Sequence, residues 1–176
     1  MILAIDPGTT HSAYVIYDPP LAAVESHARI PNESLLVAIH DGFPETNHCV
    51  IEAVASYGQP VGQEVFTTAI WCGRFAEAWD WHQQGVGTTA AAFIFRKAVK
   101  LHLCGRVTGC GDPVIRQRLI DLFSDGRGKA VAIGVKKSPG PLYGLKGDEF
   151  AALALAVTYA ETVLGGGVPE VHREED

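Results

Sequence analysis

The sequence has few of the features that mark membrane, disulfide-rich or disordered proteins. Its longest uncharged apolar-rich run, residues 150–160, is about half of the roughly 20 residues that cross a bilayer. The chain has only four cysteines, whose spacing matches neither a C-x-x-C pair nor a zinc finger, so we expect buried, reduced thiols. With 47% hydrophobic and 19% charged residues, the chain is predicted to fold around a core.

The ends of the chain give two further expectations. The first residues, Met1 to Asp6, contain no basic stretch and no cleavage site, which favours a cytoplasmic protein. The length of 176 residues suits one domain, expected over residues 1–164. Residues 165–176, which are rich in glycine and then in acid, are predicted to form a flexible acidic tail.

Basic residues are concentrated in the middle of the chain. The formal net charge is −7 over residues 1–73, +7 over 74–146 and −6 over 147–176. Twelve of the 14 Lys and Arg residues therefore lie in one stretch of an acidic protein. Such a stretch is compatible with solvated helix faces and with a nucleic-acid surface.

The pattern of apolar residues predicts an α/β fold. Residues 2–5 form a continuous apolar run that Asp6-Pro7-Gly8 breaks, and residues 12–17 and 22–30 are rich in strand-forming residues. Short turns between these three segments favour antiparallel pairing. A fourth strand is predicted over residues 48–54 and a fifth over 90–95, giving a mixed five-stranded sheet flanked by helices.

Helices are predicted between and after these strands. A short one should follow the capping residues Asn32 to Ser34, and residues 63–81 form a longer one whose buried face includes Phe66, Ile70 and Phe75. Trp71, Trp79 and Trp81 are interpreted as packing residues. Further helices are expected around residues 97–100, 113–123 and 148–164, and residues 136–141 are predicted to form a loop.

Three carboxylates occupy unusual positions in this pattern. Asp6 and Glu52 end apolar strands, and Asp148 begins an apolar helix. Each has an ordinary explanation as a turn, strand-end or helix-dipole residue. If the first and fourth strands are neighbours, however, all three lie at one sheet edge, where a divalent cation would relieve their repulsion. Such a site, with Mg²⁺ or Mn²⁺ as one or two ions per subunit, suits phosphodiester hydrolysis.

Four segments resemble the RuvC-type Holliday junction resolvases of the RNase H-like superfamily. ILAIDPGTTHSAYVIYD resembles the first family motif, with Asp6 at its metal-binding position. VIEAVASYG resembles the second, with Glu52, and KGDEFAALALAV the last, with Asp148. FRKAVKLHLCG is similar to an arginine-to-lysine stretch whose DNA-facing lysine is Lys100. The longer segments 56–75 and 136–159 are closest to members from bacteriophages and prophages, whose site of action would be the bacterial cytoplasm.

The resemblance implies an RNase H-like fold and a Mg²⁺-dependent endodeoxyribonuclease that resolves Holliday junctions by paired symmetric nicks. Asp6, Glu52 and Asp148 would be catalytic metal ligands, and the products would carry 5′-phosphate and 3′-hydroxyl ends. Many relatives have another acid three positions into the last helix, where this chain has Ala151. Glu149 is the alternative donor, although adjacent helix residues point about 100° apart.

Branched DNA and a second copy of the chain are the expected partners. Two symmetric nicks require two active sites, hence a homodimer, and the helix over residues 63–81 is the candidate interface. Phosphate contacts are assigned to basic residues, and base stacking to an aromatic one. The DNA-binding candidates are Lys100, Lys136, Lys137, Lys146, Arg74, Arg96 and Tyr57.

Three other functions stay open to different degrees. A related nuclease acting on flaps, forks or RNA would use the same carboxylates. A catalytically silent branched-DNA-binding module is compatible with Ala151. Asp6-Pro7-Gly8-Thr9-Thr10 also resembles the phosphate loop of sugar-kinase and actin-like ATPases, but those place the nucleotide between two domains, and this chain has room for one.

Overall fold

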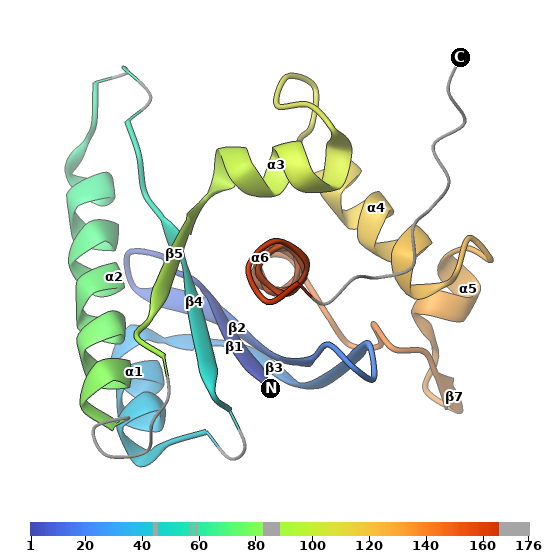
Figure 1. Cartoon of the computed structure of the whole chain (residues 1–176), viewed down its shortest axis with the longest axis horizontal. Coiled ribbons are helices and arrows are strands. Elements are labelled where there is room, and N and C mark those ends of the chain that lie inside the picture. The colour runs from blue at the N-terminus through green and yellow to red at the C-terminus, as the bar shows by residue number, and fades with distance from the viewer. Residues whose placement is uncertain (44–45, 57, 59, 83–88, 166–176) are drawn as a thin grey trace.

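A five-stranded mixed sheet organises the protein, shown as a computed structural model in Figure 1. The structure describes residues 1–43, 46–56, 58, 60–82 and 89–165. The strands of the sheet are β1 (Ile2–Asp6), β2 (His11–Asp18), β3 (Ala23–Pro31), β4 (His48–Ala53) and β5 (Ala92–Phe95). The helices are α1 (Asn32–Asp41), α2 (Gln63–His82), α3 (Arg96–Cys104), α4 (Asp112–Phe123), α5 (Lys129–Ala132) and α6 (Glu149–Thr162).

The strand order β3-β2-β1-β4-β5 confirms the predicted sheet. β1 and β2 are antiparallel, as are β2 and β3, whereas β4 runs parallel to β1 and to β5. β1 is therefore central, and its apolar run Ile2–Ile5 is fully buried. Its continuous hydrophobicity follows from coverage on both faces.

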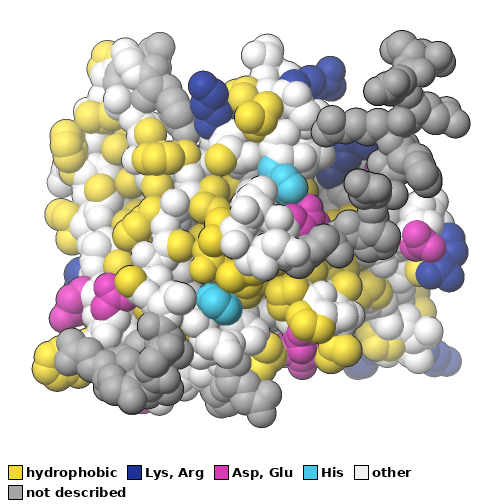
Figure 2. All heavy atoms as spheres, in the orientation of Figure 1, with side chains coloured by type: hydrophobic (Ala, Val, Ile, Leu, Met, Phe, Trp, Pro, Cys, Tyr) yellow, Lys and Arg dark blue, Asp and Glu magenta, His cyan; other side chains and the backbone are white. Residues whose placement is uncertain are grey.

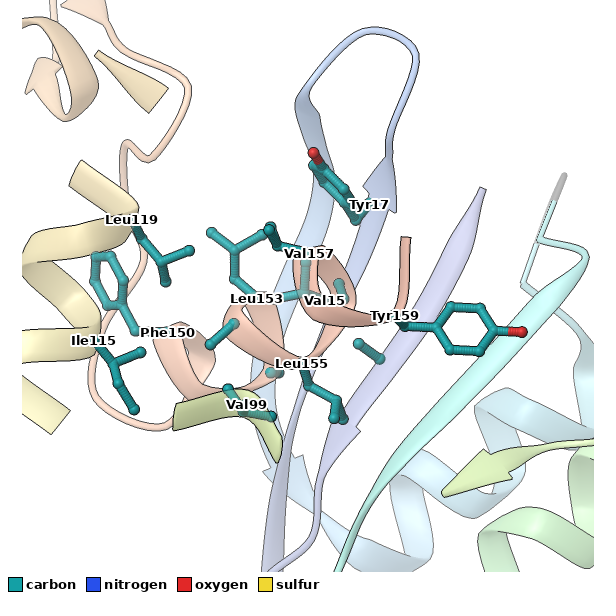
Figure 3. Packing of buried hydrophobic residues seen from close by; sticks show 14 of the residues in the cluster. Val15, Tyr17, Val99, Ile115, Leu119, Phe150, Leu153, Leu155, Val157 and Tyr159 are labelled. Atoms are coloured by element: carbon teal, nitrogen blue, oxygen red, sulfur yellow. The ribbon is translucent and has the colours of Figure 1, made fainter. Parts of the chain in front are cut away.

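Helices cover the two faces of the sheet unequally. α1 and α2 pack on one face, around a cluster that includes Leu3, Ile51 and Phe75. α6 packs on the other face and is itself covered by α3 and α4, as its end-on view in Figure 1 shows. The side chains of α6 pack both toward the sheet and toward α4 (Figure 3), which explains why this helix is apolar around its whole circumference.

A hydrogen-bonded turn ends β1 at Asp6. The Gly8 amide donates to Ser12 Oγ, the Ser12 hydroxyl donates to Asn32 Oδ1, and Asn32 Nδ2 donates to the Gly8 carbonyl. A Cβ at Gly8 would lie 2.3 Å from the His11 carbonyl oxygen, so only glycine fits there. The prediction that residues 32–34 cap α1 is wrong, because the helix already begins at Asn32 without a side-chain cap, and the Asn32 side chain holds this turn instead.

Two predictions about α2 are only partly right. Phe66 and Ile70 are 60% and 63% exposed, and the buried residues are Cys72, Phe75, Ala78 and Trp79. The spacing of apolar residues predicted the helix correctly. It did not identify the side that faces the sheet, because α2 has apolar residues on more than one side. Likewise, Trp79 is buried and Trp71 packs on Phe75, whereas Trp81 is 63% exposed.

The segment after α5 also differs from its prediction. Residues 136–141 are not a simple loop, because β6 (Gly134–Val135) and β7 (Ser138–Pro139) form a small hairpin around Lys136 and Lys137. Gly134 has φ of +67°, and a Cβ there would lie 2.3 Å from the Ser138 carbonyl oxygen. Pairs of two residues are too short to show a strand pattern in the sequence.

The cysteines divide into two pairs of different kind. Cys49 and Cys72 are free and buried, as expected. Cys104 and Cys110 instead form a disulfide between the end of α3 and the segment before α4, which contradicts the prediction of four reduced thiols. Their spacing of six residues allows the chain to turn back on itself, and sequence spacing does not reveal that the turn forms.

The tail prediction concerns residues 165–176, of which 166–176 lie outside the described residues. Within the part of the chain that the structure describes, no helix combines the length and apolarity needed to span a membrane.

Candidate metal and nucleic-acid site

The register of the sheet brings Asp6 and Glu52 together. Ile5 of β1 is the partner of Ile51 on the parallel strand β4, so Asp6 and Glu52 follow at the same level on neighbouring strands. Side chains alternate along a strand, which places both carboxylates on the face that α6 covers. There they stand at the carboxyl edge of both strands.

The start of α6 supplies the third carboxylate. Asp148 immediately precedes the helix, and it lines one pocket together with Asp6 and Glu52. The pocket lies between the sheet edge, the start of α6 and α4, whose Ile115 and Ile120 contribute apolar walls. The structure therefore gathers the three carboxylates as the sequence analysis predicted, although their catalytic role stays a prediction.

Burial and mutual repulsion disfavour ionisation at this edge. Burial, reinforced by the charge of Glu52, raises the pKa of Asp6 from 3.8 to about 8, and Arg96 only partly opposes this. Burial also raises the pKa of Glu52, and Arg96 and Lys100 oppose that shift. A cation in the pocket would reverse the penalty on both groups.

Two of the three carboxylates are held by arginines. Arg96 Nη1 donates to Glu52 Oε2 at 3.2 Å, and Arg29 Nε donates to Asp148 Oδ2 at 2.9 Å. The Asp6 carboxylate has no hydrogen-bond partner among the described residues. In that same part of the chain, no three Asp, Glu, His or Cys side chains lie in a group that could hold one metal ion.

Glu149 points away from this pocket. Its Oε2 accepts hydrogen bonds from the Lys146 amide at 2.7 Å and pairs with His27 Nδ1 at 3.0 Å, and the residue is buried. These contacts fasten the start of α6 to β3. Glu149 thus supports the position of Asp148, and the observed arrangement does not bring it to the pocket as a fourth donor.

The predicted DNA-binding residues lie in several places. Arg96 lines the pocket and Lys100 follows it by one turn of α3, whereas Lys136, Lys137 and Lys146 are exposed around the hairpin and before α6. Arg74 lies apart from them on α2, where it pairs with Glu33 and stacks on Trp71. Tyr57 lies outside the described residues.

Three further charged residues line the pocket and were not predicted from the sequence. Asp112 begins α4 and pairs with Arg96, Arg116 stacks on the Phe150 ring, and Lys129 begins α5. Asp112 was detectable only as an acid before a helix-starting proline, which is an ordinary pattern. The two cations stood among many others in the basic stretch, and only the packing of α4 and α5 singles them out.

The chain matches known proteins in its structure but not in its sequence. No model of a protein family matches the chain, and no curated protein matches it either. Among solved structures, RuvC from Thermus thermophilus has a TM-score of 0.58 at 18% identity, over 94% of this chain and 96% of that one. The chain has the RuvC fold.

A second RuvC structure gives the same result. The T. thermophilus protein in complex with a Holliday junction substrate has a TM-score of 0.54 and 16% identity, over 92% of this chain and 95% of that one. The RuvC likeness therefore extends over almost the whole chain and includes the five-stranded RNase H-like sheet.

Proposed function

We propose that this protein is a metal-dependent endonuclease that cuts branched DNA, and that a four-way junction is its substrate. The observation that carries the proposal is the pocket shared by Asp6, Glu52 and Asp148, which three distant parts of the chain bring to one sheet edge. The full-length match to the RuvC fold, including a structure with a Holliday junction substrate, supports the choice of substrate.

The donor set fits a hard divalent cation. All three candidate ligands are carboxylates, the oxygen donors that Mg²⁺ and Mn²⁺ prefer. Asp6, whose pKa burial raises to about 8, is also the one whose side chain has no hydrogen-bond or ion-pair partner among the described residues. When bound, such an ion lowers the pKa of water and stabilises charge on a phosphate. Asp6, Glu52 and Asp148 would hold one or two such ions per subunit once their side chains turn toward one another, because in the described structure no three of them form a group that holds one ion.

Positive side chains around the pocket would hold the DNA backbone. Arg116 and Lys129 line it directly, and Lys100 is near enough to Glu52 to lower the pKa of that carboxyl. Lys136, Lys137 and Lys146 extend this set toward the hairpin. Contacts of this kind bind phosphates with little base selectivity, which suits an enzyme that recognises branch structure.

A homodimer completes the proposal, with α2 at its interface. Phe66, Ile70 and Trp81 are exposed on α2, and Phe93 and Phe95 are each 49% exposed on β5. Figure 2 shows hydrophobic side chains over these two elements. Two copies joined by a two-fold axis would present two pockets, as paired nicks require.

Substitution of Asp6 tests the nuclease assignment. Asp6→Asn keeps the size of the side chain and removes its charge, so we expect Mg²⁺-dependent cleavage of a four-way junction to be lost while junction binding is retained. Cleavage by gel assay and binding by fluorescence anisotropy would be measured on the same preparation. Cleavage at the wild-type rate would remove Asp6 from the reaction.

A further inference from the structure

Arg96 has a double ion pair within the pocket. Its Nη1 donates to Glu52 Oε2 at 3.2 Å, and its Nη2 donates to Asp112 Oδ1. The side chain is only 20% exposed, although arginine usually lies in solvent. The guanidinium is thus enclosed between a carboxylate of β4 and one of α4.

The fold places Arg96 there directly. Glu52 is the register partner of Ile94 on β5, and Arg96 follows two residues later as the first residue of α3. Asp112 begins α4, which packs beside α3. The two carboxylates differ in exposure, since the Glu52 side chain is 16% exposed and that of Asp112 is 83% exposed.

This arrangement puts a permanent positive charge on a candidate metal ligand. Arginine stays protonated in proteins, so it leaves Glu52 only by moving. The guanidinium of Arg96 already pairs with a second carboxylate, that of Asp112, which lies toward the solvent. Among the described residues, Glu52 has Arg96 as its ion-pair partner, and a cation that uses the same oxygen must displace it.

We propose that Arg96 is an internal counter-cation that competes with the divalent metal for Glu52, and that Asp112 retains the displaced guanidinium when the metal binds. The proposal rests on the function proposed above. It assigns Arg96 and Asp112 as positioning residues that set the metal affinity of the pocket.

Calorimetric titration of the full-length protein with Mn²⁺ tests the competition. Arg96→Gln removes the competing charge, so we expect Mn²⁺ to bind about tenfold more tightly than to the wild type. Arg118→Gln makes the same charge change at an exposed position of α4 outside the pocket and should leave the affinity within about twofold.

A second variant tests the same competition in case Arg96→Gln does not fold. Arg96→Lys keeps the charge but cannot bridge two carboxylates with a planar fork, and we expect an affinity between those of the wild type and Arg96→Gln. If circular dichroism shows Arg96→Gln to be unfolded, the Arg96→Lys affinity decides the question.

A double-mutant cycle tests the role of Asp112. Asp112→Asn should weaken Mn²⁺ binding in the wild type, because Arg96 then has Glu52 as its remaining partner. In the Arg96→Gln background the same change should have a much smaller effect. Equal effects in both backgrounds would show that Asp112 acts independently of Arg96, and would overturn its assigned role.

The outcomes separate this inference from the proposed function. Unchanged or weaker Mn²⁺ binding by folded Arg96→Gln overturns the competition, while junction cleavage by the wild type would keep the nuclease assignment. Tighter binding by Arg96→Gln without DNA cleavage by any variant supports the competition and contradicts the nuclease. Absence of Mn²⁺ binding in both proteins contradicts both.

Discussion

The two longest helices of the protein, α2 and α6, lie on opposite faces of one sheet and differ in almost every other respect. α6 is buried from Glu149 to Ala160 apart from the partly exposed Ala151. α2 buries four of its 20 residues and exposes Phe66, Ile70 and Trp81. One helix is thus enclosed by other helices of the chain, whereas the other has an apolar side that no described residue covers.

The difference follows from the number of layers on each face. α3 and α4 cover α6, and no described helix covers α2 in the same way. An enclosed helix can position the residue that immediately precedes it, and α6 places Asp148 at the pocket in this way. A helix with one free apolar side suits contact with another molecule. The difference between the helices therefore supports the proposed chemistry at the start of α6 and the proposed assembly through α2.

The largest expected effect is at the start of α6. Asp148→Asn should reduce Mg²⁺-dependent cleavage of branched DNA about a thousandfold, because it removes a charge from the pocket. Glu64→Gln, an equivalent change in the first turn of α2, should leave the rate unchanged. Rates under single-turnover conditions measure both. Equal losses, or no loss, would mean that the two helix starts do not differ in function.

Burial predicts the next effect, on stability. Leu153 is fully buried in α6 and packs in the cluster of Figure 3, so Leu153→Ala should lower the free energy of unfolding by about 3 kcal/mol. Ile70→Ala on α2 should change it by less than about 0.5 kcal/mol in the monomer. Urea denaturation at a concentration where light scattering shows monomers would compare them. Similar values for the two variants would contradict the difference in coverage.

Assembly through α2 should respond to charge. The double change Phe66→Glu/Ile70→Glu introduces two charges on the exposed side of the helix and should weaken dimerisation roughly a hundredfold, as measured by light scattering across a dilution series. Val37→Glu, at an exposed apolar position of α1, is the control and should leave the dimer intact. A dimer that tolerates the double change would place the interface elsewhere.

The smallest expected effect is the pH dependence of stability that Asp6, at the end of β1, contributes. The pKa of Asp6 is raised to about 8 in the folded protein, so the folded state binds this proton more tightly than the unfolded state. Stability of the metal-free protein should therefore fall as pH rises from about 4 to 8, and the smallest loss that we expect is about 1.4 kcal/mol, the equivalent of one pKa unit.

Asp6→Asn should remove that part of the pH dependence and unfold at higher temperature than the wild type at pH 8 in EDTA. Asp41→Asn, at the exposed end of α1, should not. Thermal melts at pH 5 and pH 8 provide the readout. A wild-type pH profile in Asp6→Asn would show that Asp6 is not held at a cost in the folded state.

The same two helices show what sequence could and could not predict. The apolar run of β1 and the apolar composition of α6 are local patterns, and from them the sequence predicted the sheet, its central strand and the common location of Asp6, Glu52 and Asp148. The exposed side of α2 was not predictable, because periodicity identifies a helix without saying which of two apolar sides meets the sheet.

The missed parts of the pocket have a similar cause. Asp112, Arg116 and Lys129 reach it only through the packing of α4 and α5, which leaves no pattern in the sequence. The pairing of Arg96 with Glu52 depends on the register of β4 and β5. The Cys104–Cys110 disulfide depends on the fold of the intervening turn. Apart from the short elements α5, β6 and β7, the features that the sequence did not predict are contacts between elements.

The pocket at the start of α6 is proposed to cut branched DNA, and a panel of DNA substrates tests this function most directly. Purified protein with Mg²⁺ would be assayed on four-way junctions, Y-forks, flaps, linear duplex and RNA–DNA hybrid of shared sequence, with Asp6→Asn as control. We predict symmetric paired nicks in the four-way junction and none in the linear duplex. Equal cutting of duplex and junction, or junction binding without any cutting, would contradict the account.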